Sequence, residues 1–273
     1  MDRKRTKIIT IASIKGGVGK STSAIILATL LSKEYKVLLI DMDTQASTTS
    51  YFYEKVKENN INLERKNICE VLKDSIDINN IIVNIENNLN LIPSYLTLHS
   101  LNGDFYCQNK HKAIDLKLKI EIKRLKTIYD YIVIDTNPSL DLTLKCALNA
   151  THYIVIPMTA EKWTFESYEL LEFFIKDLEK LSPIFFIITR FKKTNTHKEL
   201  LKIMQKKNNF LGIVSEKEGL NKKIATNSEF DFKSNSILEY NHILKNLISH
   251  IKIYSKKNGN AKNKLSSARQ FVR

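Results

Sequence analysis

Short apolar runs recur along the first two thirds of the chain. They lie at residues 8–14, 37–41, 131–135, 153–157 and 184–189. Within each run the apolar residues follow one another without polar alternation, so each run is expected to form a strand that is buried on both faces. Helix-length segments separate the runs, and this interleaving is typical of a parallel sheet covered by helices on both faces. The sequence therefore predicts an α/β fold with a twisted, mostly parallel sheet in a single domain, residues 1–255.

The remaining pattern is less regular. The segment between residues 54 and 130 suggests connecting loops rather than a second domain, and its Asn-rich stretch at 85–90 is interpreted as such a loop. We expect a short helix at 68–73, a strand at 89–93, a long basic helix at 110–127, further helices at 163–181, 196–208 and 236–254, and a basic, mobile tail at 256–273.

A glycine-rich loop, KGGVGKST, occupies residues 15–22 between the first apolar run and a helix-compatible segment. Glycines let backbone N–H groups turn toward phosphate oxygens, and the N-terminus of the following helix adds partial positive charge. The loop differs from the general pattern G-x-x-x-x-G-K-[ST], because Ile14 stands where the first glycine is expected. Lys15 precedes the glycines instead, so the loop has two lysines, Lys15 and Lys20. The sequence predicts a nucleotide triphosphatase.

This lysine-first loop resembles the deviant Walker A motif of the ParA/MinD ATPases, which have the P-loop NTPase fold. The resemblance implies ATP and Mg²⁺ as cofactors, with Lys20 on the β- and γ-phosphates and the Ser21 hydroxyl on the metal. It also implies that Lys15 reaches across a nucleotide-sandwich homodimer to the phosphates of the other subunit, as a catalytic cation. The residues expected to cradle the nucleotide are Lys15, Gly16, Gly17, Val18, Gly19, Lys20, Ser21 and Thr22.

Acidic residues end or follow three of the apolar runs. Asp41 and Asp43 belong to the second run and its continuation, and Asp135 closes the third. Because ligands of parallel sheets lie at the carboxyl ends of the strands, these acids are expected to meet at the glycine-rich loop. The resemblance assigns Asp43 to the attacking water, Asp41 to supporting the nucleotide site, and Asp135 to Mg²⁺ through a water. A turn or helix cap is the alternative for Asp41.

Two further positions follow from the same resemblance. Glu161 matches an acid at the nucleotide interface of the family. Asn137 replaces the first of two prolines that usually follow the acid at 135, so the resemblance does not fix the path of this second switch segment.

The formal charge of +14 is concentrated in the last third of the chain. Residues 1–189 have 24 basic against 23 acidic residues, residues 190–223 have ten against three, and residues 240–273 have eight against none. Such an excess favours a polyanion partner such as DNA, with a solvated basic surface as the alternative. The candidate DNA contacts are Arg190, Lys192, Lys193, Lys222 and Lys223, each of which has a solvated loop position as its alternative.

Within the superfamily, the continuation Thr44–Gln45–Ala46 after the D-x-D pair is of the ParA type. The resemblance thus implies a short-form DNA-partition ATPase without an N-terminal helix-turn-helix domain. It would dimerise on ATP, bind DNA without sequence preference, and hydrolyse ATP when a ParB-like centromere-binding partner stimulates it. A MinD-like ATPase that cycles on membranes is the alternative, although the terminal stretch is too weakly apolar for an anchor.

Three scattered cysteines and the absence of an apolar leader favour a reduced, cytoplasmic protein associated with the nucleoid. No membrane partner is expected.

Overall fold

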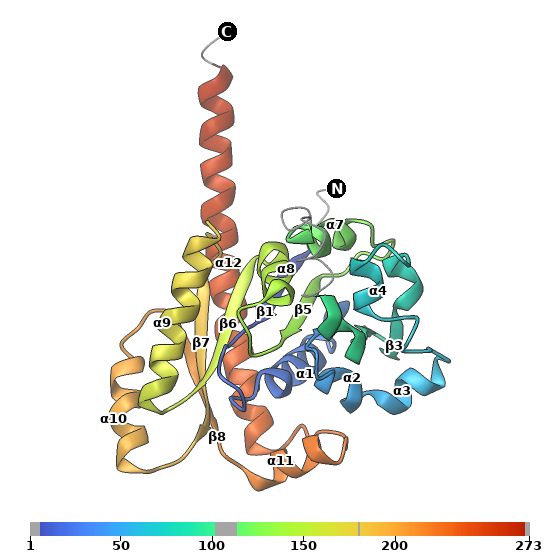
Figure 1. The fold of residues 1–273 in the computed structure, drawn as a ribbon. Helices are drawn as coiled ribbons and strands as arrows, with labels where there is room; N and C mark the ends of the chain where they lie inside the picture. The colour runs from blue at the N-terminus through green and yellow to red at the C-terminus, as the bar shows by residue number, and fades with distance from the viewer. Residues whose placement is uncertain (1–5, 102–113, 180, 271–273) are drawn as a thin grey trace.

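The computed structural model describes the backbone of residues 6–101, 114–179 and 181–270, and the side chains of these residues except 162–165 and 257–270. Eight strands form one sheet in the order β3-β4-β2-β5-β1-β6-β7-β8 (Figure 1). Every neighbouring pair is parallel except β3 with β4. The strands are β1 (Lys7–Ile11), β2 (Val37–Met42), β3 (Val83–Glu86), β4 (Leu89–Ile92), β5 (Tyr131–Thr136), β6 (Tyr153–Thr159), β7 (Ile184–Phe191) and β8 (Phe210–Ser215).

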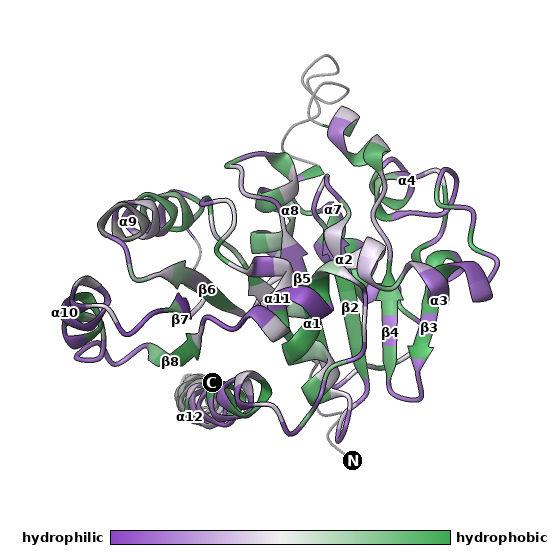
Figure 2. Cartoon of the chain, turned by 90° about the horizontal axis from the view of Figure 1, so that it is seen from below, coloured by the Kyte–Doolittle hydropathy of each residue, from purple (hydrophilic) through white to green (hydrophobic). Residues whose placement is uncertain are grey.

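Helices cover both faces of this sheet, as expected from strands without polar alternation (Figure 2). On one face, α1 and α12 pack on alternate strand residues such as Ile9, Leu39 and Val133. The intervening residues, such as Leu38 and Ile132, face the helices of the opposite layer. The helices are α1 (Lys20–Leu31), α2 (Ser47–Tyr51), α3 (Tyr53–Glu58), α4 (Ile68–Leu72), α7 (Lys117–Lys123), α8 (Leu142–Ala150), α9 (Lys162–Asp177), α10 (Asn195–Met204), α11 (Glu218–Ala225) and α12 (Asn235–Gln270).

The predicted α/β class with a mostly parallel sheet is confirmed, and so are all five strands predicted from the main apolar runs. The strand order also brings the predicted acids together. Strand β5 lies between β1 and β2, and the register pairs Asp135 with Ile11 on one side and with Asp41 on the other. Both acids therefore lie at the carboxyl ends of adjacent parallel strands, next to the loop that leaves β1.

Some expectations for the middle of the chain were wrong. The Asn-rich stretch at 85–90 is the tip of an antiparallel hairpin formed by β3 and β4, rather than a plain loop. The predicted helix over 110–127 is reduced to α7, Lys117–Lys123, in the described part, because the chain turns at 115–116 and must then reach the start of β5. Residues 110–113 lie outside the described residues.

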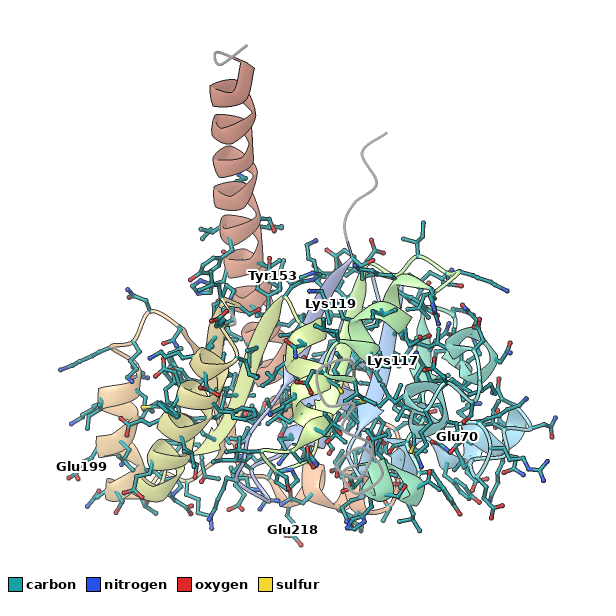
Figure 3. The ribbon with its side chains drawn as sticks, turned by 45° about the horizontal axis from the view of Figure 1, so that its top comes forward. Glu70, Lys117, Lys119, Tyr153, Glu199 and Glu218 are labelled. Atoms are coloured by element: carbon teal, nitrogen blue, oxygen red, sulfur yellow. The ribbon has the colours of Figure 1, made fainter. Side chains whose placement is uncertain are left out.

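Helix α12 is longer than its predicted span of 236–254. Its backbone continues to Gln270 and projects well beyond the body of the molecule (Figure 1). Its last described side-chain contact with the sheet joins the Ser255 hydroxyl to the Tyr153 hydroxyl at 3.3 Å, near the labelled Tyr153 in Figure 3. The division into a domain ending at 255 and a mobile tail stays a prediction.

The cysteines and the membrane expectation can be compared with the structure only within the described residues. Cys69 and Cys146 are buried, as expected of core residues, and neither forms a disulfide among the described residues, whereas Cys107 lies outside the described part. In that part of the chain, no helix combines the length and the apolar character needed to cross a membrane.

Candidate nucleotide site

The glycine-rich loop connects β1 to α1 and has the backbone of a phosphate cradle. Gly17 and Gly19 have φ angles of +72° and +82°, which residues with a Cβ rarely adopt. Gly19 is the N-cap of α1 and has no side chain with which to cap it, so the first-turn N–H groups face the loop. The Thr189 hydroxyl of β7 donates to the Val18 carbonyl at 2.7 Å and ties the loop to the sheet.

The two loop lysines lie in different surroundings. Lys20 is buried, and its Nζ donates to the Lys15 carbonyl at 3.1 Å. Burial lowers the pKa of Lys20, while the charges of Asp135 and Asp43 raise it. A buried ammonium is stable only with strong acceptors around it, and a polyphosphate supplies them. The half-buried Lys15 lines a cavity beside the loop.

Asp41 holds the backbone that follows β2. Its Oδ1 accepts from the Asp43 N–H at 3.0 Å, and its Oδ2 accepts from the N–H and the hydroxyl of Thr49 at 2.8 and 2.7 Å. Complete burial raises the pKa of Asp41 to about 6, although these hydrogen bonds oppose the change. The geometry matches the capping interpretation of Asp41, and its supporting role toward a nucleotide stays a prediction.

Asp135 has the features of a metal ligand. It is completely buried, and burial, followed by the nearby charge of Asp41, raises its pKa to about 8. Its Oδ2 accepts from the Thr48 hydroxyl at 2.8 Å, whereas its Oδ1 has no hydrogen-bond partner among the described residues. The Ser21 hydroxyl lies close enough to favour the charged form.

The environment of Asp135 fits Mg²⁺ better than a metal held by protein groups alone. Among the described residues, no three His, Cys, Asp or Glu side chains gather as a metal cluster. Mg²⁺ needs only one or two carboxylates when phosphates and water complete its shell. Asp135 and Ser21, at the start of α1, would hold such an ion.

Asp43 is also buried, and its backbone is fixed from two sides. Its Oδ1 accepts from the Gln45 N–H at 2.9 Å, and the Ser94 hydroxyl, just beyond β4, donates to its carbonyl at 2.8 Å. The turn continues through Ala46 with φ +51°, into α2. These hydrogen bonds fix the backbone of Asp43, and the Asp43 carboxylate lies close enough to Lys20 for their charges to interact.

The segment after β5 has a side-chain contact at Asn137, where the family pattern has a proline. The Asn137 Nδ2 donates to Asp141 Oδ2 at 2.7 Å, and Asp141 Oδ1 caps α8 by accepting from the Leu144 N–H at 3.1 Å. The segment between β5 and α8 is therefore fixed by a hydrogen bond where a proline ring would restrict φ.

A cavity of about 280 Å³ extends from the loop toward the ends of β6, β7 and β8. Its lining residues are Lys15, Gly16, Gly17, Val18, Thr159, Glu161, Arg190, Lys192, His197 and Glu216. The structure thus brings Glu161, Arg190 and Lys192 to the glycine-rich loop, whereas Lys193, Lys222 and Lys223 do not line this cavity. Lys192 forms a salt bridge of 3.0 Å with Glu216.

Several site residues were not found from the sequence. They are Thr48, Thr49, Ser94, Thr189 and His197, and the first four anchor the loops by hydrogen bonds. Thr48, Thr49 and Ser94 follow the carboxyl ends of strands, and Thr189 lies near the end of β7. This position is the only signal that the sequence offers for them.

Comparison with known proteins agrees with this geometry. A family model described as an AAA domain matches residues 6–188. The sporulation initiation inhibitor protein Soj of Bacillus subtilis is 33% identical over 171 residues, which are 60% of this chain and 63% of Soj. The structure of a putative plasmid partition protein from Borrelia burgdorferi B31 bound to AMPPNP is 58% identical, with a TM-score of 0.86 over 90% of this chain and 100% of that one. This chain belongs to the ParA family.

A second Borrelia burgdorferi plasmid partition protein structure, at 55% identity and TM-score 0.81, covers the same shares of the two chains. Membership confirms the resemblance inferred from the lysine-first loop, and the P-loop NTPase fold with it. This ParA-family chain is a homologue of plasmid and chromosome partition proteins.

Proposed function

We propose that this protein is an ATPase for DNA partition that binds Mg²⁺-ATP, dimerises on it, binds DNA without sequence preference and hydrolyses ATP when a ParB-like partner stimulates it. The observation that carries the proposal is the convergence of Lys20, Asp43 and Asp135 at one glycine-rich loop, with a buried carboxylate oxygen of Asp135 open to a cation. The AMPPNP bound by the 58% identical relative supports ATP as the nucleotide.

Phosphoryl transfer needs neutralised phosphate charge, a metal and a placed water. In our proposal, Lys20 and the N–H groups of the loop neutralise the phosphates, and Ser21 and Asp135 hold Mg²⁺. Asp43 orients or deprotonates the water. Its backbone is fixed by Ser94, which is a requirement for a residue that must place a water accurately.

Lys15 is proposed to act in the other subunit of an ATP-bound homodimer. Its neighbours in the cavity wall include Glu161 and Arg190, so the wall has the charged character of a polar interface. A cation supplied in trans changes turnover by roughly 10³ to 10⁵ in other NTPases. We expect Lys15→Ala to lose ATP hydrolysis while retaining AMPPNP binding.

DNA binding is proposed for the basic last third of the chain, with the protein in the cytoplasm on the nucleoid. Lys193 and Lys222 are exposed and lie outside the nucleotide cavity, so they are the better candidates for DNA contact. Arg190 and Lys192 line the nucleotide cavity, so we propose that they contact the nucleotide and not the DNA.

The proposal is tested by ATP turnover of the purified protein, with and without non-specific duplex DNA. We expect turnover to require Mg²⁺ and to fall to background in Asp43→Ala, with AMPPNP affinity unchanged in that variant. DNA retention should fall steeply with salt, and replacing Lys193 and Lys222 by alanine should reduce the salt slope by about one per lost phosphate contact. Retention on anionic liposomes without DNA binding would favour a membrane-cycling ATPase instead.

A further inference from the structure

Asn137 follows β5 directly and has no part in the mechanism proposed above. Its side chain is buried, with 2% of the residue exposed. The two ends of its amide have different surroundings. The Nδ2 group donates to Asp141 Oδ2 at 2.7 Å, whereas the Oδ1 atom is buried and accepts no hydrogen bond from the described residues. A buried carbonyl oxygen without a donor is costly, so this atom is suited to accept a hydrogen bond from a ligand.

Asp141 fixes the orientation of this amide. A carboxylate only accepts hydrogen bonds, so it selects the NH₂ end of the amide and leaves the Oδ1 atom on the side away from Asp141. Asp141 is itself held at the start of α8, because its Oδ1 accepts from the Leu144 N–H at 3.1 Å and from the Thr143 hydroxyl at 2.7 Å. The Asn137 oxygen therefore points in one fixed direction before any ligand binds.

The sheet places Asn137 beside the candidate metal site. Asp135 and Asn137 are two residues apart along β5 and its continuation, and side chains two apart in an extended segment lie on the same face. The register of β2 with β5 ends with Met42 beside Thr136, so the residues that follow, Asp43 and Asn137, are neighbours. Asp135 Oδ1 is also buried and accepts no hydrogen bond from the described residues. Two such acceptors thus lie at the same end of β5.

We propose that the Asn137 Oδ1 atom accepts a hydrogen bond from a water of the Mg²⁺ shell, so that Asn137 is a positioning residue for the metal. Mg²⁺ gives up its waters reluctantly and keeps several of them when it binds to a protein. The inference rests on the proposed function, in which Ser21 and Asp135 hold this ion. A proline, which the family pattern has at this position, offers no side-chain acceptor, so the role belongs to the asparagine of this chain.

An amide fits this position better than another acid would. Burial, followed by the charges of Asp41 and Asp43, raises the pKa of Asp135 to about 8, so like charges already oppose one another at this edge of the sheet. A further carboxylate would add to that repulsion. The neutral oxygen of Asn137 supplies an acceptor without adding charge.

The test measures how much Mg²⁺ strengthens AMPPNP binding, by calorimetry with the metal and with EDTA in its place. The variants are Asn137→Ala and Asn137→Pro, which both remove the acceptor. The matched control, Asn246→Ala, removes an asparagine of α12 whose Nδ2 donates to the Leu211 carbonyl at 2.8 Å, near the amino end of β8. We expect the gain in affinity from Mg²⁺ to fall about three- to tenfold in both Asn137 variants, as for the loss of one hydrogen bond, and to stay within about twofold in the control.

Mn²⁺ in place of Mg²⁺ provides a second readout that needs no turnover, because the electron paramagnetic resonance signal of the free ion reports how much metal is bound. We expect both Asn137 variants to bind Mn²⁺ more weakly than the control when AMPPNP is present. Asn137→Pro keeps the test informative if the alanine variant does not fold, since proline is the residue of the family pattern at this position.

Two results would overturn the role of Asn137 and leave the proposed ATPase in place. In the first, the Asn137 variants lose AMPPNP affinity equally with and without metal, as a purely structural role requires. In the second, Mg²⁺ strengthens AMPPNP binding equally in all variants. If the unchanged protein binds no AMPPNP, or gains no affinity from Mg²⁺, the proposed ATPase fails and the role of Asn137 fails with it.

Discussion

Thr49 is the residue at which the hydrogen-bond network of the site can be tested most directly. Its hydroxyl donates to Asp41 Oδ2 at 2.7 Å and accepts from the Ser94 N–H at 2.8 Å, and all three residues are buried. Thr49→Val keeps the shape of the side chain but removes both bonds. It leaves the Ser94 N–H without a partner, which costs about 1 to 3 kcal/mol, and it removes one of the hydrogen bonds to the Asp41 carboxyl.

Asp41 retains the N–H donors of Thr49 and Asp43, so the loss at the carboxyl is partial. We therefore expect Thr49→Val to lower the free energy of unfolding by about 2 to 4 kcal/mol. Equilibrium urea unfolding without nucleotide, followed by circular dichroism, measures this change, and an unaltered m-value is required for the comparison.

Thr49→Ser is the matched control, because it keeps the hydroxyl and removes only a methyl group, a loss of about 0.5 to 1.5 kcal/mol. If valine and serine at this position gave the same stability, the hydroxyl network would not hold the turn, and the reasoning would be refuted. We also expect Thr49→Val to slow ATP turnover, since Ser94 is the residue that fixes the backbone of Asp43.

Three further outcomes are expected. Gly19→Ala should weaken AMPPNP binding, as measured by calorimetry. A φ of +82° costs a residue with a Cβ about 1 to 2 kcal/mol, so the loop must shift. Unchanged affinity would contradict the role of the loop as a phosphate cradle. Tyr240→Phe loses the 2.9 Å hydrogen bond to the Ser23 hydroxyl, and urea unfolding at pH 8 should show a loss of about 1 kcal/mol. Burial raises the pKa of Tyr240 from 10.0 to about 12, so the folded protein keeps a proton that the unfolded chain releases, and stability falls as pH rises through this window by about 1.4 kcal/mol per unit. The phenylalanine variant lacks the contribution of Tyr240, so its stability should fall less steeply with pH than that of the unchanged protein, and parallel pH profiles would contradict this expectation. Glu216→Gln breaks the partly exposed pair with Lys192 at the cavity wall and should change stability by less than about 1 kcal/mol. A larger loss in urea unfolding would show that this pair contributes more than a surface salt bridge does.

The strands that build the site could be predicted because they are buried on both faces and appear as apolar runs. Strands β3 and β8 could not be predicted in this way. Strand β3 exposes Asn84 and Glu86 at the sheet edge, and β8 is interrupted by Gly212. The glycine is explained only by the tertiary structure, because a Cβ there would lie 2.9 Å from Ile243 of α12, and its φ is +150°.

The residues of the candidate site also fall into those that the sequence pattern predicts and those that only the fold explains. Lys20, Asp43 and Asp135 could be predicted, since the loop spacing and the carboxyl ends of parallel strands are properties of the sequence pattern. Ser94 and Thr189 could not be predicted, because a single hydroxyl at or near the end of a strand forms no recognisable motif. Their hydrogen-bond partners, Asp43 and Val18, come from segments that are distant in the sequence. The sequence offers Arg190 and Lys192 as candidate DNA contacts, whereas in the structure both line the nucleotide cavity, because β7 ends beside the glycine-rich loop.

Helix α2 has five residues and is too short to be stable by itself. Its position depends on anchors at its two sides: the carboxyls of Asp41 and Asp135 hold Thr48 and Thr49, and Asn227 and Ser228 hold the end of the helix. Asp41 and Asp135 end the strands beside the glycine-rich loop, whereas Asn227 and Ser228 lie in the connection from α11 to α12. Helix α2 therefore joins the candidate nucleotide site to the C-terminal third of the chain by hydrogen bonds on both of its sides.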